Sequence, residues 1–366
     1  MNPASFFSPD YATARAKFRA AAKAAGAEVV TYPHPLQGPD GGDLSTDVVR
    51  IGPADAHRYV VCNTSTHGVE GFCGSGPLIG VLSEQIYREL PPNVALLLIH
   101  AINPHGFAWL RRVNEDNVDL NRNFLDFSQP LPVNAEYAPI HQYLVPRNFE
   151  GEELAQADAE LAKARERLGA RGFQTAVSGG QYAFPDGLFY GGNKPTWSNQ
   201  TLRRLLPELI GDATHVMFLD FHTGLGPYGY CEPINGHAPG TKAFDRLYEW
   251  IGDCVTSAQT GTSSSTRLSG TIGLGVMEAL PNAIHTKTTL EYGTRPNDYV
   301  RLALRSDCWL HNHGDLKSAR AKEIKALIRD AFYRDYDDWK ELVYVRARQI
   351  IRKGIAGLSA QSDQKD

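Results

Sequence analysis

Short apolar runs alternate with segments of helical periodicity along most of the chain. The run NVALLLIHAIN at residues 93–103 is almost purely apolar, which is typical of a strand covered on both faces of an α/β sheet. We interpret residues 216–221 and 286–292, which are flanked by turn residues, in the same way. Further strands are predicted at residues 27–33, 44–52 and 58–63.

Helices are predicted between and after these strands. Residues 9–25 are rich in Ala, Lys and Arg and end before Gly26, a favoured helix stop. Ser75 is a candidate N-cap, with Pro77 in the first turn of the helix that follows. Further helices are predicted at residues 151–170, 241–258, 316–333 and 337–353. This alternation predicts an α/β protein with a mixed, largely parallel twisted sheet flanked by helices.

The pattern favours one domain over residues 1–366. Residues 126–200 differ from the rest, because Pro, Asn, Gln and Gly are frequent there around a single charged helix. We expect this segment to be an insertion near the active-site edge. Residues 316–366 are expected to form C-terminal helices packed on the domain.

Composition excludes several classes of partner. The chain has 37 Lys and Arg against 41 Asp and Glu, a formal charge of -4, so it lacks the basic excess expected for nucleic-acid or anionic-membrane binding. No segment has the 18 or more continuous apolar residues of a membrane span, and residues 1–18 do not resemble a secretory signal. Five scattered cysteines without a CxxC spacing indicate neither disulfides nor a thiolate zinc site. We therefore expect a cytoplasmic protein; its oligomeric state is left open.

Three residues at predicted strand ends are candidate metal ligands. His67 and Glu70 follow the strand at 58–63, and His222 follows the strand at 216–221, where open α/β sheets bind their ligands. Singly, each is more often a hydrogen-bonded loop residue. Together, two neutral imidazoles and one carboxylate describe a zinc site with an open position for water.

Glu291 is a candidate for proton transfer. It is an acid near the end of the strand-like run 286–292, where burial would raise its pKa and suit it to general acid and base chemistry. The alternative is an edge-strand carboxylate that faces water.

A family resemblance joins these residues. The motifs NPHGF, RRVN and VDLNRNF at residues 103–124 closely resemble the corresponding segment of the M14 zinc carboxypeptidases. HGVE, FHTG and LEYGT stand in the same order as that family's first two ligands, third ligand and catalytic glutamate. The resemblance runs from about residue 58 to residue 294.

The resemblance implies a role for each matching residue. It assigns one Zn²⁺ to His67, Glu70 and His222, and makes Glu291 the general base and then the general acid. Asp119 is similar to the family's acid that holds an imidazole, here that of His67, in the ligating tautomer.

The same motifs imply how substrate is bound. Arg112 is similar to the family's arginine that stabilises the developing oxyanion. Asn121 and Arg122 are similar to the pair that binds the free carboxylate of the substrate, for which a guanidinium fork is well suited.

The sequence also departs from the M14 pattern. His105 replaces the usual aspartate of NPDG, and no tyrosine lies between Tyr248 and Tyr292, where carboxypeptidases bring a mobile tyrosine over the substrate. The Ser- and Gly-rich run at 261–275 is expected to be a flexible loop. The pattern also resembles the M14-like DUF2817 proteins and, more distantly, the succinylglutamate desuccinylase and aspartoacylase branch.

Three functions follow from these observations. The first is a zinc-dependent, metallocarboxypeptidase-like hydrolase that cleaves a small peptide at an amide bond next to a free carboxylate. The second is a zinc-dependent deacylase of N-acyl amino acids, and the third is a non-catalytic carboxylate-binding protein. The substrate side chain is not defined by the sequence.

Overall fold

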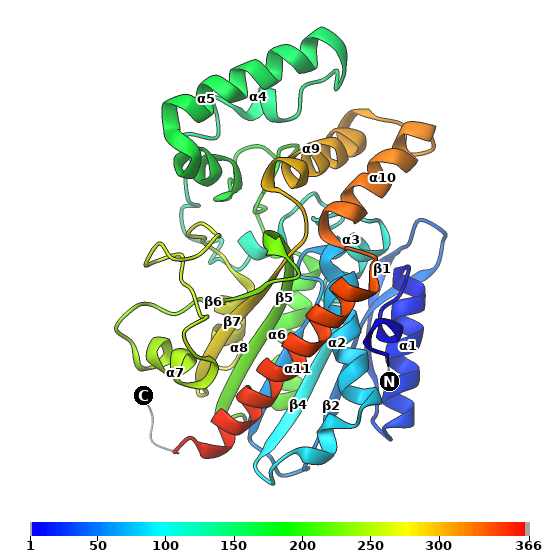
Figure 1. The fold of residues 1–366 in the computed structure, drawn as a ribbon, viewed down its shortest axis with the longest axis vertical. Helices are drawn as coiled ribbons and strands as arrows, with labels where there is room; N and C mark the ends of the chain where they lie inside the picture. Colours follow the sequence, from blue (N-terminus) through cyan, green and yellow to red (C-terminus); the bar gives the residue numbers. More distant parts are fainter. Residues whose placement is uncertain (1, 363–366) are drawn as a thin grey trace.

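A seven-stranded mixed sheet forms the centre of the protein in the computed structural model, which describes residues 2–362 (Figure 1). The order across the sheet is β1-β2-β4-β3-β5-β7-β6. β4, β3, β5 and β7 are parallel, and the strands at both edges pair antiparallel. The predicted α/β class and mixed sheet are thus confirmed. The strands are β1 (Val30–Gln37), β2 (Asp43–Ile51), β3 (Arg58–Asn63), β4 (Val94–His100), β5 (His215–Tyr228), β6 (Cys231–Asn235) and β7 (Ile284–Gly293).

Both faces of the central strands are buried. In β4, Leu96 and Leu98 belong to one apolar cluster, whereas Leu97 and Ile99 belong to another, because successive side chains of a strand point to opposite faces. This two-sided burial explains why the strand is apolar at every position.

Helices cover each face of the sheet. α1 (Tyr11–Ala24), α2 (Gly71–Ser83) and α11 (Asp337–Ala360) contribute to the first cluster, and α6 (Trp197–Ile210) and α8 (Ile272–Ala279) contribute to the second. The other helices are α3 (Pro104–Ala108), α4 (His141–Leu144), α5 (Gly151–Ser178), α7 (Lys242–Ile251), α9 (Asn297–His313) and α10 (Ala319–Phe332). Figure 1 shows α4 and α5 beyond one end of the sheet. Within residues 2–362, no helix combines the length and apolar character that a bilayer crossing requires.

The helix expected to start at Ser75 starts at Gly71 instead, so Pro77 lies inside it. Ser75 does not cap the helix, and its Oγ lies 2.9 Å from Nε2 of His100. A Cβ on Gly74 would lie 2.2 Å from Oγ1 of Thr64, so the glycines allow close packing of the helix. Packing, which local sequence does not show, therefore outweighs the low helix propensity of this segment.

Several other boundaries differ from the prediction. α7 ends at Ile251, seven residues early, where Gly252 has a φ of 101° that favours glycine. β1 begins at Val30 and continues through two prolines, which an edge strand tolerates. The sequence did not predict α6, α9 or β6. The run at 261–275, expected to be a loop, enters α8 at Ile272.

Candidate active site

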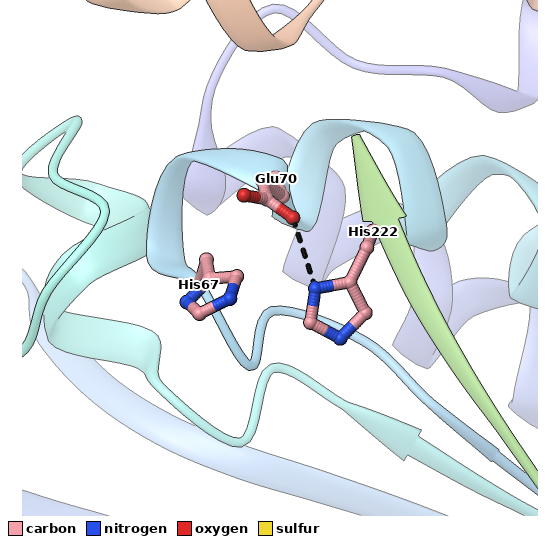
Figure 2. Close-up of side chains that lie close together, drawn as sticks. All are labelled: His67, Glu70 and His222. Atoms are coloured by element: carbon pink, nitrogen blue, oxygen red, sulfur yellow. Dashed lines mark ion pairs between the residues drawn. The ribbon is translucent and has the colours of Figure 1, made fainter. Parts of the chain in front are cut away.

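The three candidate metal ligands meet at one buried point. His67 precedes the short 3-10 helix Gly68–Glu70 after β3, and His222 lies in β5. One ligand atom from each of His67, Glu70 and His222 lies within 4.8 Å of the others, and all three residues are buried. Figure 2 shows both imidazoles and the carboxylate facing one another.

His222 is fixed on both sides by carboxylates. Its Nδ1 lies 3.3 Å from Oε2 of Glu70, and its Nε2 lies 2.5 Å from Oδ2 of Asp220. Asp220 is itself held, because its Oδ1 accepts hydrogen bonds from Asn63 and Thr66, each at 2.7 Å. Nδ1 of His222 is therefore the nitrogen that faces the site.

Asp220 was not singled out in the sequence. The available signal was the D-x-H spacing in a strand, since residues i and i+2 share one face. Asp220 gives His222 the carboxylate partner that metal-binding histidines usually have on their second nitrogen.

His67 has a corresponding arrangement with Asp119. Nδ1 of His67 lies 3.4 Å from Oδ1 of Asp119 and has no hydrogen-bonded partner, while its Nε2 lies 2.7 Å from Nη2 of Arg112. Arg112 also contacts Oδ2 of Asp119 at 3.2 Å and Oε1 of Glu70 at 3.0 Å. The structure thus brings Arg112 and Asp119 to the ligand cluster.

Backbone hydrogen bonds join the segment that follows His67 to the segment that contains Arg111 and Arg112. The N–H groups of Gly68 and Val69 donate to the carbonyls of Arg112 and Arg111, at 3.0 and 2.8 Å. A Cβ on Gly68 would lie 2.1 Å from the carbonyl carbon of Gly106, so only glycine fits there. The NPHGF and RRVN motifs therefore position the HGVE motif by direct packing.

Glu291 lies beside the ligands, on the neighbouring strand. It pairs with His222 in the parallel register of β5 and β7, and its Oε1 accepts a hydrogen bond of 3.1 Å from the N–H of Leu225. Burial and the nearby charge of Glu70 raise the pKa of Glu291 to about 8. The alternative of a carboxylate facing water on an edge strand is wrong, because Glu291 is 6% exposed and β7 is an inner strand.

Asn121 and Arg122 line the same cavity. Oδ1 of Asn121 accepts a hydrogen bond from the N–H of Ile272 at 3.0 Å, so the amide nitrogen is left for other partners. Nη1 and Nη2 of Arg122 donate to the carbonyls of Asn121 and Ser178, at 2.9 and 2.6 Å. Nε of Arg122 is buried without a partner.

A cavity of about 400 Å³ opens over the ligands, Glu291, Asn121 and Arg122. Its walls include Gln174, Ser178 and Phe189, so residues of the segment 126–200 contribute to it. Another part of the wall is built from residues 258–273 and has no tyrosine. Glu232 holds this wall, because it accepts hydrogen bonds from Ser264.

The protonation of the two imidazoles differs. Burial and the charge of Arg112 hold the pKa of His67 well below its ordinary value, which leaves this imidazole neutral. Burial also lowers the pKa of His222, but the carboxylates of Asp220 and Glu70 outweigh this effect and raise it well above its ordinary value. Binding of a cation at Nδ1 of His222 would therefore displace a proton.

The donor set fits one zinc ion. Two imidazoles and a carboxylate are the three protein ligands of many catalytic zinc sites. The carboxylates of Asp119 and Asp220, each beside one nitrogen of an imidazole, match the outer contacts that such ligands require. Within residues 2–362, this is the one group of three such ligands that is close enough.

Comparison of the sequence with protein families gives one assignment. The profile of the family described as "Protein of unknown function (DUF2817)" matches residues 7–346. A search of curated protein sequences found no match.

Comparison with solved structures finds distant likenesses. Carboxypeptidase A from Helicoverpa armigera is 14% identical, with a TM-score of 0.49, over 97% of this chain and 74% of the other. The ectoine utilization protein EutE from Ruegeria pomeroyi is 13% identical, with a TM-score of 0.35, over 88% and 68%. A metallo-carboxypeptidase from Burkholderia cenocepacia is 13% identical, with a TM-score of 0.35, over 90% and 68%. Likeness at this level does not carry the activity of these proteins over to this chain.

Proposed function

The chain belongs to the DUF2817 family, and we propose that it is a zinc-dependent hydrolase that cleaves an amide bond next to a free carboxylate. One observation carries the proposal. The ligand atoms of His67, Glu70 and His222 meet within 4.8 Å, and Glu291 faces them from the neighbouring strand. A carboxylate with a raised pKa beside three buried polar side chains that line one cavity supports this role, because perturbed pKa values cluster at functional sites.

Zinc held by His67, Glu70 and His222 would polarise a carbonyl oxygen and lower the pKa of a coordinated water molecule. Glu291 can accept a proton from the attacking water and donate it to the leaving nitrogen, because its pKa lies close to neutrality. Burial of this carboxylate therefore serves proton transfer in both directions.

Two groups of this chain would orient the substrate. Arg112 is a cation held at the ligand cluster by Glu70 and Asp119, where it can stabilise negative charge on the oxygen of the cleaved carbonyl. Asn121 and Arg122 line the cavity and can bind a terminal carboxylate with N–H donors. The distance from Arg112 to the pair Asn121 and Arg122 would set which bond is cleaved.

Metallocarboxypeptidase activity is the first form of this proposal. The second is deacylation of an N-acyl amino acid, which leaves the same free carboxylate next to the cleaved bond. The wall of residues 258–273 favours this second form, since it has no tyrosine to cover a peptide. Both forms require the same metal ligands and the same general base.

A paired assay tests the proposal. Zinc-loaded protein is given blocked dipeptides with a free C-terminus and, separately, N-acetyl and N-succinyl amino acids, with release of the free amino acid as the readout. Hydrolysis in either series that stops on zinc removal and returns on zinc addition supports a zinc hydrolase, and the preferred series identifies its form. Binding of these compounds without turnover would instead support a carboxylate-binding protein.

A further inference from the structure

Lys287 places a cation in the floor of the cavity. It lies four residues before Glu291 in β7, and Lys287, Thr289 and Glu291 share one face because strand side chains alternate. All three line the cavity. At about 3.3 Å per residue, the backbone of Lys287 lies about 13 Å from that of Glu291, which is deeper along the sheet than the metal site.

The charge of Lys287 has no partner among the described residues. Its backbone N–H donates to Nε2 of His237, but no hydrogen bond or ion pair involves its Nζ. Burial alone lowers the pKa of Lys287, and no charged neighbour adds to this effect. The acidic side chains that line the cavity, Glu70, Asp220 and Glu291, are held at the ligand cluster.

A partly buried lysine without a counter-charge is unfavourable unless an anion reaches it. The cavity is the side from which such an anion can come, because Lys287 lines it. Besides Arg112 at the ligand cluster and Arg267, the cavity therefore presents two more cations to a bound molecule, Arg122 and Lys287.

Two glycines make room for the lysine stem. A Cβ on Gly236, which follows β6, would lie 3.2 Å from Cε of Lys287. A Cβ on Gly273, in the first turn of α8, would lie 3.0 Å from its Cδ. Either side chain would crowd the stem, so the channel that directs Lys287 is formed by Gly236 and Gly273.

We propose that Lys287 binds a carboxylate on the side chain of the substrate residue whose main-chain carboxylate is bound by Arg122. The preferred substrates then end in glutamate or aspartate, whether the protein acts as a peptidase or as a deacylase. This inference rests on the proposed function, because it assumes that Arg122 binds the main-chain carboxylate of the substrate. A neutral side chain of the same shape would leave Lys287 without a partner, and this difference is the source of selectivity.

The first test compares kcat/KM for two matched substrates that end in Glu and in Gln. Zinc-loaded protein should prefer the Glu substrate by about tenfold or more. Lys287→Met should reduce that ratio to near one, whereas Lys287→Arg should keep a preference for Glu because it keeps the charge. A ratio near one in the parent, or a ratio that Lys287→Met leaves unchanged, overturns the inference.

Arg267→Met is the matched control. Arg267 is an exposed arginine that lines the mouth of the same cavity, and its Nη2 donates to the carbonyl of Gln259 at 2.8 Å. The variant removes one positive charge from the cavity, as Lys287→Met does, but leaves the charge of Lys287 in place. Its Glu-to-Gln ratio should stay near that of the parent. A ratio that falls as far as in Lys287→Met would show general attraction of anions and would overturn direct contact.

The second test needs no turnover. Binding of free L-glutamate and L-glutamine to zinc-loaded protein is measured by calorimetry, in the parent and in Lys287→Met. Tighter binding of glutamate that depends on Lys287 supports the acidic site even if no amide is hydrolysed, in which case the proposed function alone fails. Hydrolysis with equal binding of the two amino acids overturns the acidic site and leaves the hydrolase in place.

Discussion

His222 on β5 and Glu291 on β7 are direct register partners in the parallel part of the sheet. The third candidate ligand and the candidate general base are thus held by one ladder of backbone hydrogen bonds. A slip of one residue would turn one of the two side chains to the opposite face of the sheet. The geometry of the site is therefore as well fixed as the sheet itself.

Glu291→Gln separates chemistry from metal binding. The amide keeps the shape of the side chain but cannot accept a proton from water, so turnover should fall by about 10² to 10⁴. Zinc content, measured by elemental analysis after dialysis, should stay at the level of the parent. Equal turnover in the variant and the parent would remove Glu291 from the mechanism.

Asp220→Asn tests the carboxylate behind His222. The amide is a poorer acceptor for Nε2 of His222, which lies 2.5 Å from Oδ2 of Asp220, so zinc affinity should fall about tenfold to hundredfold. The measurement is a competition titration with a chelator. Asp212→Asn is the control, because Asp212 pairs with His57 and both side chains are more than half exposed. If both variants bind zinc like the parent, Asp220 has no part in the site.

Arg122→Lys tests whether Arg122 binds the free carboxylate of the substrate. Lysine keeps the charge but loses the planar fork, so KM should rise about tenfold or more while zinc content stays unchanged. Arg203→Lys provides a matched control, since Arg203 pairs with Glu278 at a partly exposed position. Steady-state kinetics with no change in KM for Arg122→Lys would place the substrate carboxylate elsewhere.

Asp307, which contacts Arg111, should make the stability of the fold depend on pH in the acid range. Its carboxylate contacts Nζ of Lys325 at 2.5 Å and Nε of Arg111 at 3.2 Å. Burial raises the pKa of Asp307, but the charges of Lys325 and Arg111 outweigh this effect and hold it below the ordinary 3.8. The carboxylate thus stabilises the folded state above pH 3.8, and this contribution is lost as the pH falls from there toward the lower, folded-state pKa.

Asp307→Asn should therefore lower the free energy of unfolding at pH 7 by about 3 kcal/mol, since it leaves buried cations unpaired. The deficit relative to the parent should shrink below pH 3.8, as followed by urea unfolding at both pH values. Asp298→Asn removes a carboxylate that pairs with Arg301 and is itself 66% exposed, so it should change little at either pH. A deficit for Asp307→Asn that does not depend on pH would refute the ionic role.

The apolar strands and the candidate metal ligands could be predicted because short stretches of sequence indicate them. β4 is apolar at each position from Val94 to Ile99, and its burial on both faces requires that pattern. His67 and Glu70 follow β3, and His222 lies in the neighbouring strand β5. The predicted strand ends made these residues candidates, and the resemblance of their motifs, in this order, to the M14 zinc carboxypeptidases joined them into one site.

What the sequence did not predict depends on contacts between distant segments. The glycines of α2 are helical because Thr64 and other neighbours pack against them. The D-x-H spacing was the one sequence signal for Asp220, and its contact with Asn63 in β3 is known only from the structure. Lys287 was hidden for the same reason, since Gly236 and Gly273, far apart in the chain, form its channel.

The most direct test of the central claim is a crystal structure of the zinc-loaded protein with anomalous data collected on both sides of the zinc absorption edge. The account predicts one strong peak about 2.0–2.2 Å from a nitrogen of His67, a nitrogen of His222 and an oxygen of Glu70. No peak between these three side chains, or zinc bound at full occupancy by other residues, would contradict it.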